Sequence, residues 1–69
     1  MKEINIGRVL IKNRHKRGIT QDELANHLGV SKGAVSKWET GDSDPSTSNL
    51  FALAKLYGIS AEELLKEVE

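Results

Sequence analysis

Residues 21–40 read QDELANHLGVSKGAVSKWET, and their spacing predicts two short helices joined by a sharp turn. Apolar side chains fall on one face of the first helix: Leu24, Ala25 and Leu28. Gly29 can end that helix without steric cost, because a residue that lacks Cβ readily adopts the left-handed conformation. Val30 is then expected to enter the core, and Ser31 is a favoured N-cap for the second helix. We therefore expect a helix-turn-helix over residues 21–40.

The second helix of this pair has two opposite sides. At about 100° per residue, its apolar residues share one side: Ala34, Val35 and Trp38. The other side is polar and has no bulky hydrocarbon: Lys32, Gly33, Ser36, Lys37 and Thr40. A helix that is anchored on one side and presents lysines and hydroxyls on the other suits the major groove of a nucleic acid.

Three further helices are predicted outside this segment. The first covers about residues 5–17, and another, over about residues 46–57, begins with a capping serine. Ser60 and Glu63 have the spacing of a capping box for the last helix. The expected inner face of that helix comprises Leu64, Leu65 and Val68. Because period-2 alternation is absent, the expected fold is all-α, a compact five-helix domain over residues 1–69.

The stretch TQDELANHLGVSKGAVSKWETG (20–41) resembles the helix-turn-helix of the Cro/C1-type DNA-binding domains, the xenobiotic-response-element (XRE) family. The preceding helix and the downstream PSTSNLFALAKLYGISAEELL (45–65) are similar to that family's first, fourth and fifth helices. The resemblance covers about residues 4–66. It implies a lambda-repressor-like domain that places the second motif helix in the major groove of double-stranded DNA.

The resemblance also implies DNA contacts at individual positions. Gln21 matches a position that hydrogen-bonds a backbone phosphate, and Thr40 aligns with a second phosphate-contacting position. The positions that face the groove correspond to Ser31, Lys32, Gly33, Ser36 and Lys37. Lysine can donate to guanine O6 and N7, and serine can bond several base edges. Simple solvation of these polar side chains is the alternative explanation.

Two features depart from the family's pattern. Gly33 stands where relatives often carry Gln, Ser or Arg, so we expect it to read DNA shape or a thymine methyl group and to add little specificity itself. Loop 41–45, GDSDP, is acidic where several relatives are basic. Its carboxylates would repel phosphates, although backbone amides at the start of the following helix can still bind one.

A structural ion pair between Arg14 and Glu39 is a further implication of the resemblance. Glu39 falls at the border of the apolar side of its helix, a position compatible with a partly buried bidentate contact. Such a pair would fix the first helix against the groove-facing helix more than it would add net stability. A phosphate contact by Arg14 is the competing role, and both roles can hold at once.

Charge is distributed unevenly, although ten Lys and Arg residues balance ten Asp and Glu residues. Residues 1–40 hold eight basic and four acidic residues, a net charge of +4. Residues 41–69 hold two basic and six acidic residues, a net charge of −4. A basic half that contains the groove-facing helix would orient the protein on a polyanion. Chance asymmetry in a short chain is the alternative.

Composition argues against several other classes of protein. Without cysteine, the 69 residues offer no disulfide and no thiolate metal site. His15 and His27 lack a ligand partner at i+3 or i+4, so we expect no metal and no cofactor. We expect no enzyme, because no nucleophile with a base, carboxylate pair or cofactor loop is visible. No stretch suits a membrane span or signal peptide, and the family suggests a bacterial or phage-encoded cytoplasmic protein.

These observations predict a transcriptional repressor that occludes a promoter by binding an inverted-repeat operator as a homodimer, weak in solution. The candidate dimer contacts are the loop before the fourth helix and apolar residues towards the end of the chain: Ile59, Leu65 and Val68. Asp22 and Glu23 are candidates for an RNA polymerase contact, although acids at a helix start also complement its dipole, and Glu23 has capping-box spacing from Thr20. The alternative function is a protein-interaction module of the same fold, such as an antitoxin or anti-repressor.

Overall fold

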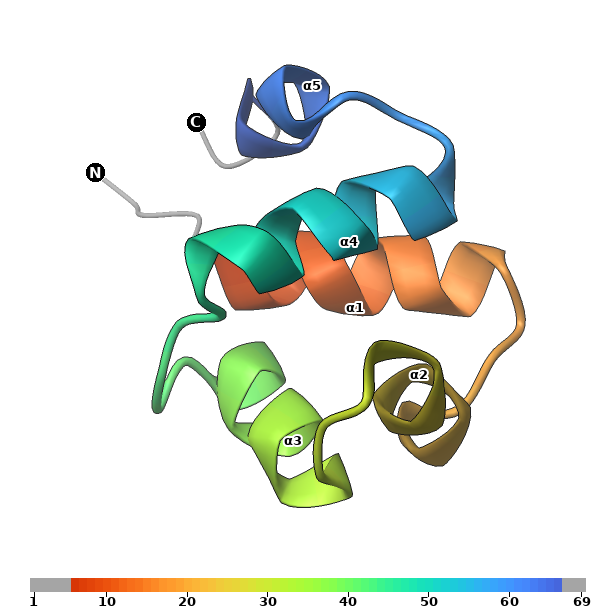
Figure 1. Cartoon of the computed structure of the whole chain (residues 1–69), viewed down its shortest axis with the longest axis vertical. Helices are drawn as coiled ribbons and strands as arrows, with labels where there is room; N and C mark the ends of the chain where they lie inside the picture. The colour runs from red at the N-terminus through yellow and green to blue at the C-terminus, as the bar shows by residue number, and fades with distance from the viewer. Residues whose placement is uncertain (1–5, 67–69) are drawn as a thin grey trace.

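In the computed structural model, residues 6–66 are described, and they form five α-helices without a strand (Figure 1). The helices are α1 (Ile6–Lys16), α2 (Gln21–Leu28), α3 (Lys32–Thr40), α4 (Thr47–Tyr57) and α5 (Ala61–Lys66). The predicted all-α fold with five helices is confirmed. Two parts of the prediction, the start of the first helix at Asn5 and the inward position of Val68, lie outside the described residues.

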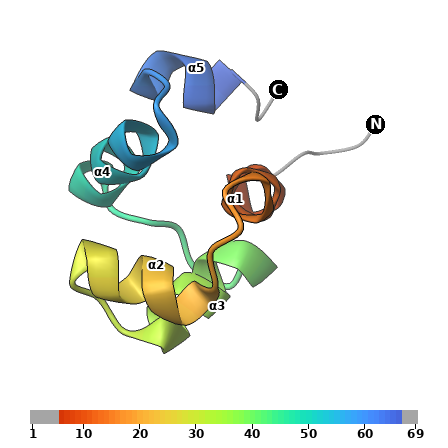
Figure 2. The same ribbon diagram turned by 90° about the vertical axis from the view of Figure 1, so that its right-hand side faces the viewer.

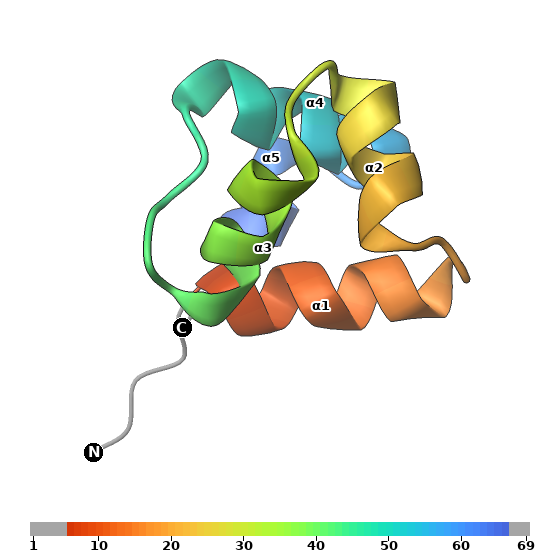
Figure 3. The same cartoon turned by 90° about the horizontal axis from the view of Figure 1, so that it is seen from below.

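The helices are arranged around α1 and α4, which cross the middle of the molecule (Figures 1 and 2). On one side of them lie α2 and α3, and on the other lies α5. Helix α3 packs on α1 and α2, whereas α4 contacts α2 and α5. Seen from below, α2 and α3 stand in front of α4 and α5, so the helix-turn-helix forms one end of the molecule (Figure 3).

All five helices contribute to one hydrophobic core. Its buried members are Val9, Leu10, Leu24, Ala25, Val35, Trp38, Leu53, Ala54, Tyr57 and Leu64. The predicted inward position of Leu65 is wrong, because this side chain is 50% exposed. Helix α5 has only six residues, and its fully buried contact is Leu64. The next side chain is turned by about 100° and leaves the core.

The turns follow the chemistry that the sequence predicts. Thr20 Oγ1 accepts from the Glu23 backbone N–H at 3.1 Å, while Glu23 Oε1 accepts from the Thr20 N–H at 2.8 Å. Ser60 and Glu63 form the same reciprocal pair at 3.0 and 3.1 Å. Gly29 closes α2 with a φ of 74°, the left-handed conformation expected of it. These bonds fix where α2 begins and ends, and so the direction in which the chain enters α3.

Helices α1 and α3 approach each other closely at Gly7. A Cβ atom at this position would lie 2.6 Å from the carbonyl oxygens of both Trp38 and Glu39. The observed crossing therefore requires glycine, since neither backbone oxygen can move without moving α3. Gly7 was not predicted from the sequence, although an isolated glycine within a helical pattern is the signal for a packing role.

Candidate nucleic-acid interface

Both ends of α3 are closed by hydrogen bonds. Ser31 Oγ accepts from the Ala34 N–H at 3.0 Å, which caps the first turn. At the other end the Lys37 carbonyl accepts from the N–H groups of Gly41 and Asp42 at 3.0 and 2.9 Å. The loop that follows is thereby folded back onto the last turn. Helix α3 is a short, well-defined element whose sides have fixed directions.

The two sides of α3 differ sharply in burial. Val35 is completely buried, and Trp38 and Glu39 are 5% and 7% exposed. The site residues predicted on and beside α3 lie away from the core: Ser31, Lys32, Gly33, Lys37 and Thr40 are exposed, and Ser36 is half-buried. The structure thus brings the predicted DNA-binding positions of α3 together on one outer surface, which we call the α3 outer face.

Lys32 and Lys37 are the cations of the α3 outer face. Neither ammonium group has a hydrogen-bond or ion-pair partner among residues 6–66. Between them the surface is open at Gly33, where an added Cβ would meet only Ser31 Oγ at 3.8 Å. In the folded domain both positive charges are therefore available to a ligand. The first turn of the helix is accessible to it as well.

Thr40 lies at the edge of this face and beside the acidic loop. Its hydroxyl is 3.2 Å from the Lys37 carbonyl oxygen and 3.1 Å from Asp42 Oδ2, both of them acceptors. The hydroxyl proton is therefore already used within the domain. A phosphate at this position would also lie near the Asp42 carboxylate, which would repel it.

Arg14 and Glu39 form a bidentate ion pair between α1 and α3. The Arg14 Nε atom donates to Glu39 Oε2 at 2.7 Å and Nη2 donates to Oε1 at 3.1 Å. The side chains are only 11% and 4% exposed. The hydrogen bond to Glu39 raises the pKa of the Arg14 guanidinium above its ordinary value. Nη1 also donates to the Ile19 carbonyl at 2.9 Å, so the guanidinium joins α1, α3 and the turn before α2.

Gln21 joins the same network, a contact that the sequence analysis did not anticipate. Its Nε2 atom donates to Glu39 Oε1 at 2.9 Å. One N–H of the amide is thus held by α3, while the other N–H is the group suited to a phosphate. The two residues are 18 positions apart and on different helices, so no periodicity in the sequence signals their contact.

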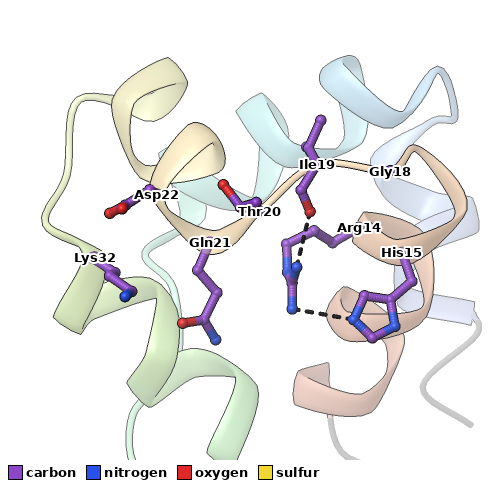
Figure 4. Close-up of a pocket in the computed structure, with 8 residues that line it drawn as sticks. All are labelled: Arg14, His15, Gly18, Ile19, Thr20, Gln21, Asp22 and Lys32. Atoms are coloured by element: carbon purple, nitrogen blue, oxygen red, sulfur yellow. Dashed lines mark hydrogen bonds between the residues drawn. The ribbon is translucent and has the colours of Figure 1, made fainter.

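An open cleft of about 570 Å³ lies beside this network (Figure 4). It is lined by Arg14, His15, Gly18, Ile19, Thr20, Gln21, Asp22 and Lys32. Its lining residues come from the end of α1, the turn between α1 and α2, the start of α2 and the start of α3. The cleft therefore places Gln21 and Lys32, two of the predicted DNA-binding residues, on the same concave surface.

Tyr57 is buried behind the interface and has an unusual hydroxyl. No hydrogen-bond partner for this hydroxyl exists among residues 6–66, although the side chain is completely buried. Burial, assisted by the negative charge of Glu39, raises the pKa of Tyr57 to about 12. The Arg17 guanidinium lies over the ring, 5.8 Å from its centroid. Tyr57 is a core residue whose neutral form the fold favours.

The described part of the chain holds neither a metal-binding cluster nor a helix that could span a membrane. Within residues 6–66, no three His, Cys, Asp or Glu side chains are grouped so that they could hold a metal ion. Helices α1 and α4, with 11 residues each, are the longest there, and no helix has both the length and the apolar character needed to cross a membrane.

The fold and the two-sided α3 define a helix-turn-helix domain. The family model described as "Helix-turn-helix" matches residues 10–64. The chain therefore belongs to the Cro/C1-type helix-turn-helix family, whose members are DNA-binding transcription regulators and not enzymes.

Two curated relatives and one solved structure illustrate the similarity. The HTH-type transcriptional regulator DicA of Escherichia coli is 41% identical over 64 residues, 93% of this chain and 47% of DicA. The HTH-type transcriptional activator BcrR of Enterococcus faecalis is 38% identical over 56 residues, 81% of this chain and 28% of BcrR. The c2 repressor of Salmonella phage P22, solved in complex with a synthetic operator, matches with a TM-score of 0.80 and 35% identity over 87% of this chain and 91% of that one. This chain thus spans less than half the length of either curated relative.

Proposed function

We propose that this domain binds double-stranded DNA sequence-specifically and regulates transcription, with α3 in the major groove. The observation that carries the proposal is the α3 outer face, where two lysines without partners among residues 6–66 project from a helix anchored on its other side by Val35 and Trp38. A helix fits the width of the major groove, and ammonium groups suit its acceptors. Similarity to a repressor solved in complex with a synthetic operator supports binding to double-stranded DNA.

The predicted contacts divide into two groups under this proposal. Base edges face Ser31, Lys32, Gly33, Ser36 and Lys37, whereas Gln21 and Thr40 face phosphates. Gln21 uses the N–H that Glu39 leaves free, so the ion pair with Arg14 positions a phosphate-binding amide as well as α3. Thr40 contributes less, because its proton is used and Asp42 is adjacent.

We further propose that the protein acts as a cytoplasmic repressor of bacterial or phage origin, which occludes a promoter as a homodimer on an inverted repeat. Two exposed apolar side chains support a self-association surface: Phe51 is 61% exposed and Leu65 is 50% exposed. Leu65 lines a cleft of about 420 Å³ with Ile6, Asp44, Pro45 and Leu50, which joins α5 to the loop before α4. Both of these regions are predicted dimer contacts.

Activation is the second candidate function. BcrR is described as an activator, and Asp22 is an exposed acid at the start of α2 that could contact RNA polymerase. The neighbouring Glu23 is less available, because its carboxylate closes the capping box on Thr20. An Asp22→Asn variant that keeps operator affinity but loses activated transcription in vitro would favour this function over repression.

The test of the proposed function is binding to duplex fragments at several salt concentrations, followed by selection from a random duplex pool and footprinting. We expect salt-dependent binding, because phosphate contacts release counterions. The selected operator should be an inverted repeat with half-site centres about one helical turn, ~34 to 36 Å, apart. Protection of a single half-site by one protein per duplex would exclude the dimer. Failure to bind any duplex would favour an antitoxin-like or anti-repressor module that binds another protein.

A further inference from the structure

We propose that each operator half-site presents guanines to Lys32 and Lys37, at two separate base pairs, and that no side chain of the α3 outer face reads adenine or cytosine specifically. This inference rests on the proposed function and adds the chemistry of the ligand. It follows from an inventory of the hydrogen-bonding groups that folding leaves free on that face.

The free groups of the α3 outer face are almost all donors. Lys32 and Lys37 each offer an ammonium group, which donates and cannot accept. Ser31 Oγ already accepts from the Ala34 N–H, and the Thr40 proton is already used. Ser36 is half-buried, and its short hydroxyl can bond several base edges without distinguishing them. The ligand must therefore supply acceptors opposite the two lysines.

Base edges differ in whether they can supply those acceptors. Guanine presents two acceptors, N7 and O6, to the major groove, so one ammonium group can donate to both. Adenine presents one acceptor and one donor and is paired by an amide, whereas cytosine presents a donor and is paired by a carboxylate. The exposed residues between Ser31 and Thr40 include neither an amide nor a carboxylate.

Three nearby groups that could recognise adenine or cytosine are occupied within the domain, and the exposed Asp22 carboxylate, which lines the cleft with Lys32, belongs to α2 and not to the α3 outer face. The amide of Gln21 is held on Glu39 by a 2.9 Å hydrogen bond and belongs to α2. Glu39 is 7% exposed, and its carboxylate accepts hydrogen bonds from both Arg14 and Gln21. The carboxylate of Asp42 lies beyond the end of α3 and is bonded to Thr40. Thymine offers an ammonium group one acceptor, O4, where guanine offers two, so guanine is the base that the lysines favour.

The helix geometry separates the two lysines along the groove. They are five residues apart, which corresponds to about 7.5 Å along the helix axis. A base-pair step is about 3.4 Å, so the ammonium groups reach different base pairs. Gly33 and Ser36 lie between them and are small, so the helix can approach closely enough for both lysines to reach base edges.

The experiment combines selection with base and side-chain substitution. Wild type, Lys32→Gln and Lys37→Gln are each used to select sequences from the same random duplex pool, with Lys55→Gln on α4 as the matched control. We expect two enriched guanines per half-site for wild type and the control. Each variant on α3 should lose one of the two guanines and keep the other, because an amide matches adenine instead. Circular dichroism and thermal melting confirm that all four proteins fold alike.

A single modified atom then tests the contact directly. Replacing a selected guanine by 7-deazaguanine removes the N7 acceptor and keeps the Watson–Crick pair. We expect wild type to lose roughly fivefold or more in affinity at each position. A Lys→Gln variant should lose no further affinity when 7-deazaguanine replaces the guanine assigned to the substituted lysine. The same variant should lose the full factor in affinity when 7-deazaguanine replaces the other guanine.

The outcomes separate this inference from the proposed function. Specific duplex binding without enriched guanines, or guanines that neither lysine variant affects, would overturn the guanine assignment and leave the proposed function standing. Absence of duplex binding by wild type would overturn both.

Discussion

The buried side of α3 packs against other helices, whereas its exposed side carries side chains that face solvent. On the buried side, contacts accumulate: Gly7 admits the backbone of α3, Trp38 fills the core, and Glu39 accepts from two side chains. On the exposed side, Lys32 and Lys37 have no partner within residues 6–66. One helix thus separates the residues needed for folding from those available for binding. Substitutions on the buried side should change stability, and those on the exposed side should change DNA affinity alone.

The largest effect on the buried side is expected at Trp38. Trp38→Ala should lower the free energy of unfolding by about 3 to 5 kcal/mol, because it leaves a cavity in a small core. Much of a 69-residue domain would then be unfolded, and DNA binding would be lost with the fold. Thermal melting and a binding titration measure both. An unchanged melting temperature with lost binding would show that Trp38 contacts DNA and that α3 is oriented differently.

The next largest effect is expected at Glu39. Glu39→Ala should destabilise the domain by about 3 kcal/mol, because the Arg14 guanidinium in its partly buried site keeps the Ile19 carbonyl and a 3.4 Å contact with His15 Nε2 but no negative charge. A double variant, Arg14→Met with Glu39→Leu, should recover part of this loss, since no unpaired charge remains. Denaturant titrations of both variants test the account. Equal destabilisation of the single and double variants would mean that packing, and not charge, dominates there.

A smaller effect is expected where α1 meets α3. Gly7→Ala should lower the free energy of unfolding by about 1 to 3 kcal/mol. The added methyl group would lie 2.6 Å from two backbone carbonyl oxygens of α3, so α1 and α3 would have to move apart. Gly33→Ala is the matched control, because its methyl group has open space and alanine favours helix by up to ~1 kcal/mol. Chemical denaturation compares the two. A Gly7→Ala protein as stable as wild type would show that α1 and α3 can shift freely.

The smallest effect at neutral pH is expected at Tyr57. Tyr57→Phe should change stability by less than about 1 kcal/mol, or raise it, because the hydroxyl has no partner among the described residues. The folded pKa of about 12 lies above the ordinary value, so wild-type stability is intact below pH ~10 and declines as pH rises towards 12. Tyr57→Phe has no phenol to ionise, so between pH ~10 and 12 its free energy of unfolding should rise by about 2 kcal/mol relative to that of wild type. Parallel stability curves from pH 8 to 12 would contradict the buried phenol.

Local chemistry explains which parts of the fold are visible in the sequence. The capping boxes at Thr20 and Ser60 and the left-handed Gly29 depend on neighbours within a few residues, so their spacing predicts them. The burial of Val35 and Trp38 follows from the 3.6-residue period. The exposed positions of Lys32 and Lys37, and thus most of the candidate interface, are visible for the same reason.

Apart from the Arg14–Glu39 ion pair, which only the family resemblance implied, features that depend on how separate helices meet were not visible in the sequence. The contact between Gln21 and Glu39 spans two helices, and the need for Gly7 appears only once α1 crosses α3. Leu65 was predicted on the inner face of the last helix together with Leu64, but this six-residue helix buries fully only Leu64. The orphan hydroxyl of Tyr57 is likewise set by tertiary packing and not by sequence spacing.

The separation of folding from binding is tested most directly by Lys32→Ala and Lys37→Ala, each compared with wild type in thermal melting and in affinity for the selected operator. Both side chains are exposed and without partners in the described structure, so unfolding free energies should agree with wild type within about 0.5 kcal/mol. Operator affinity should fall by the equivalent of roughly 1 to 3 kcal/mol for each variant. If both variants bind the operator as tightly as wild type, α3 is not the helix that reads DNA.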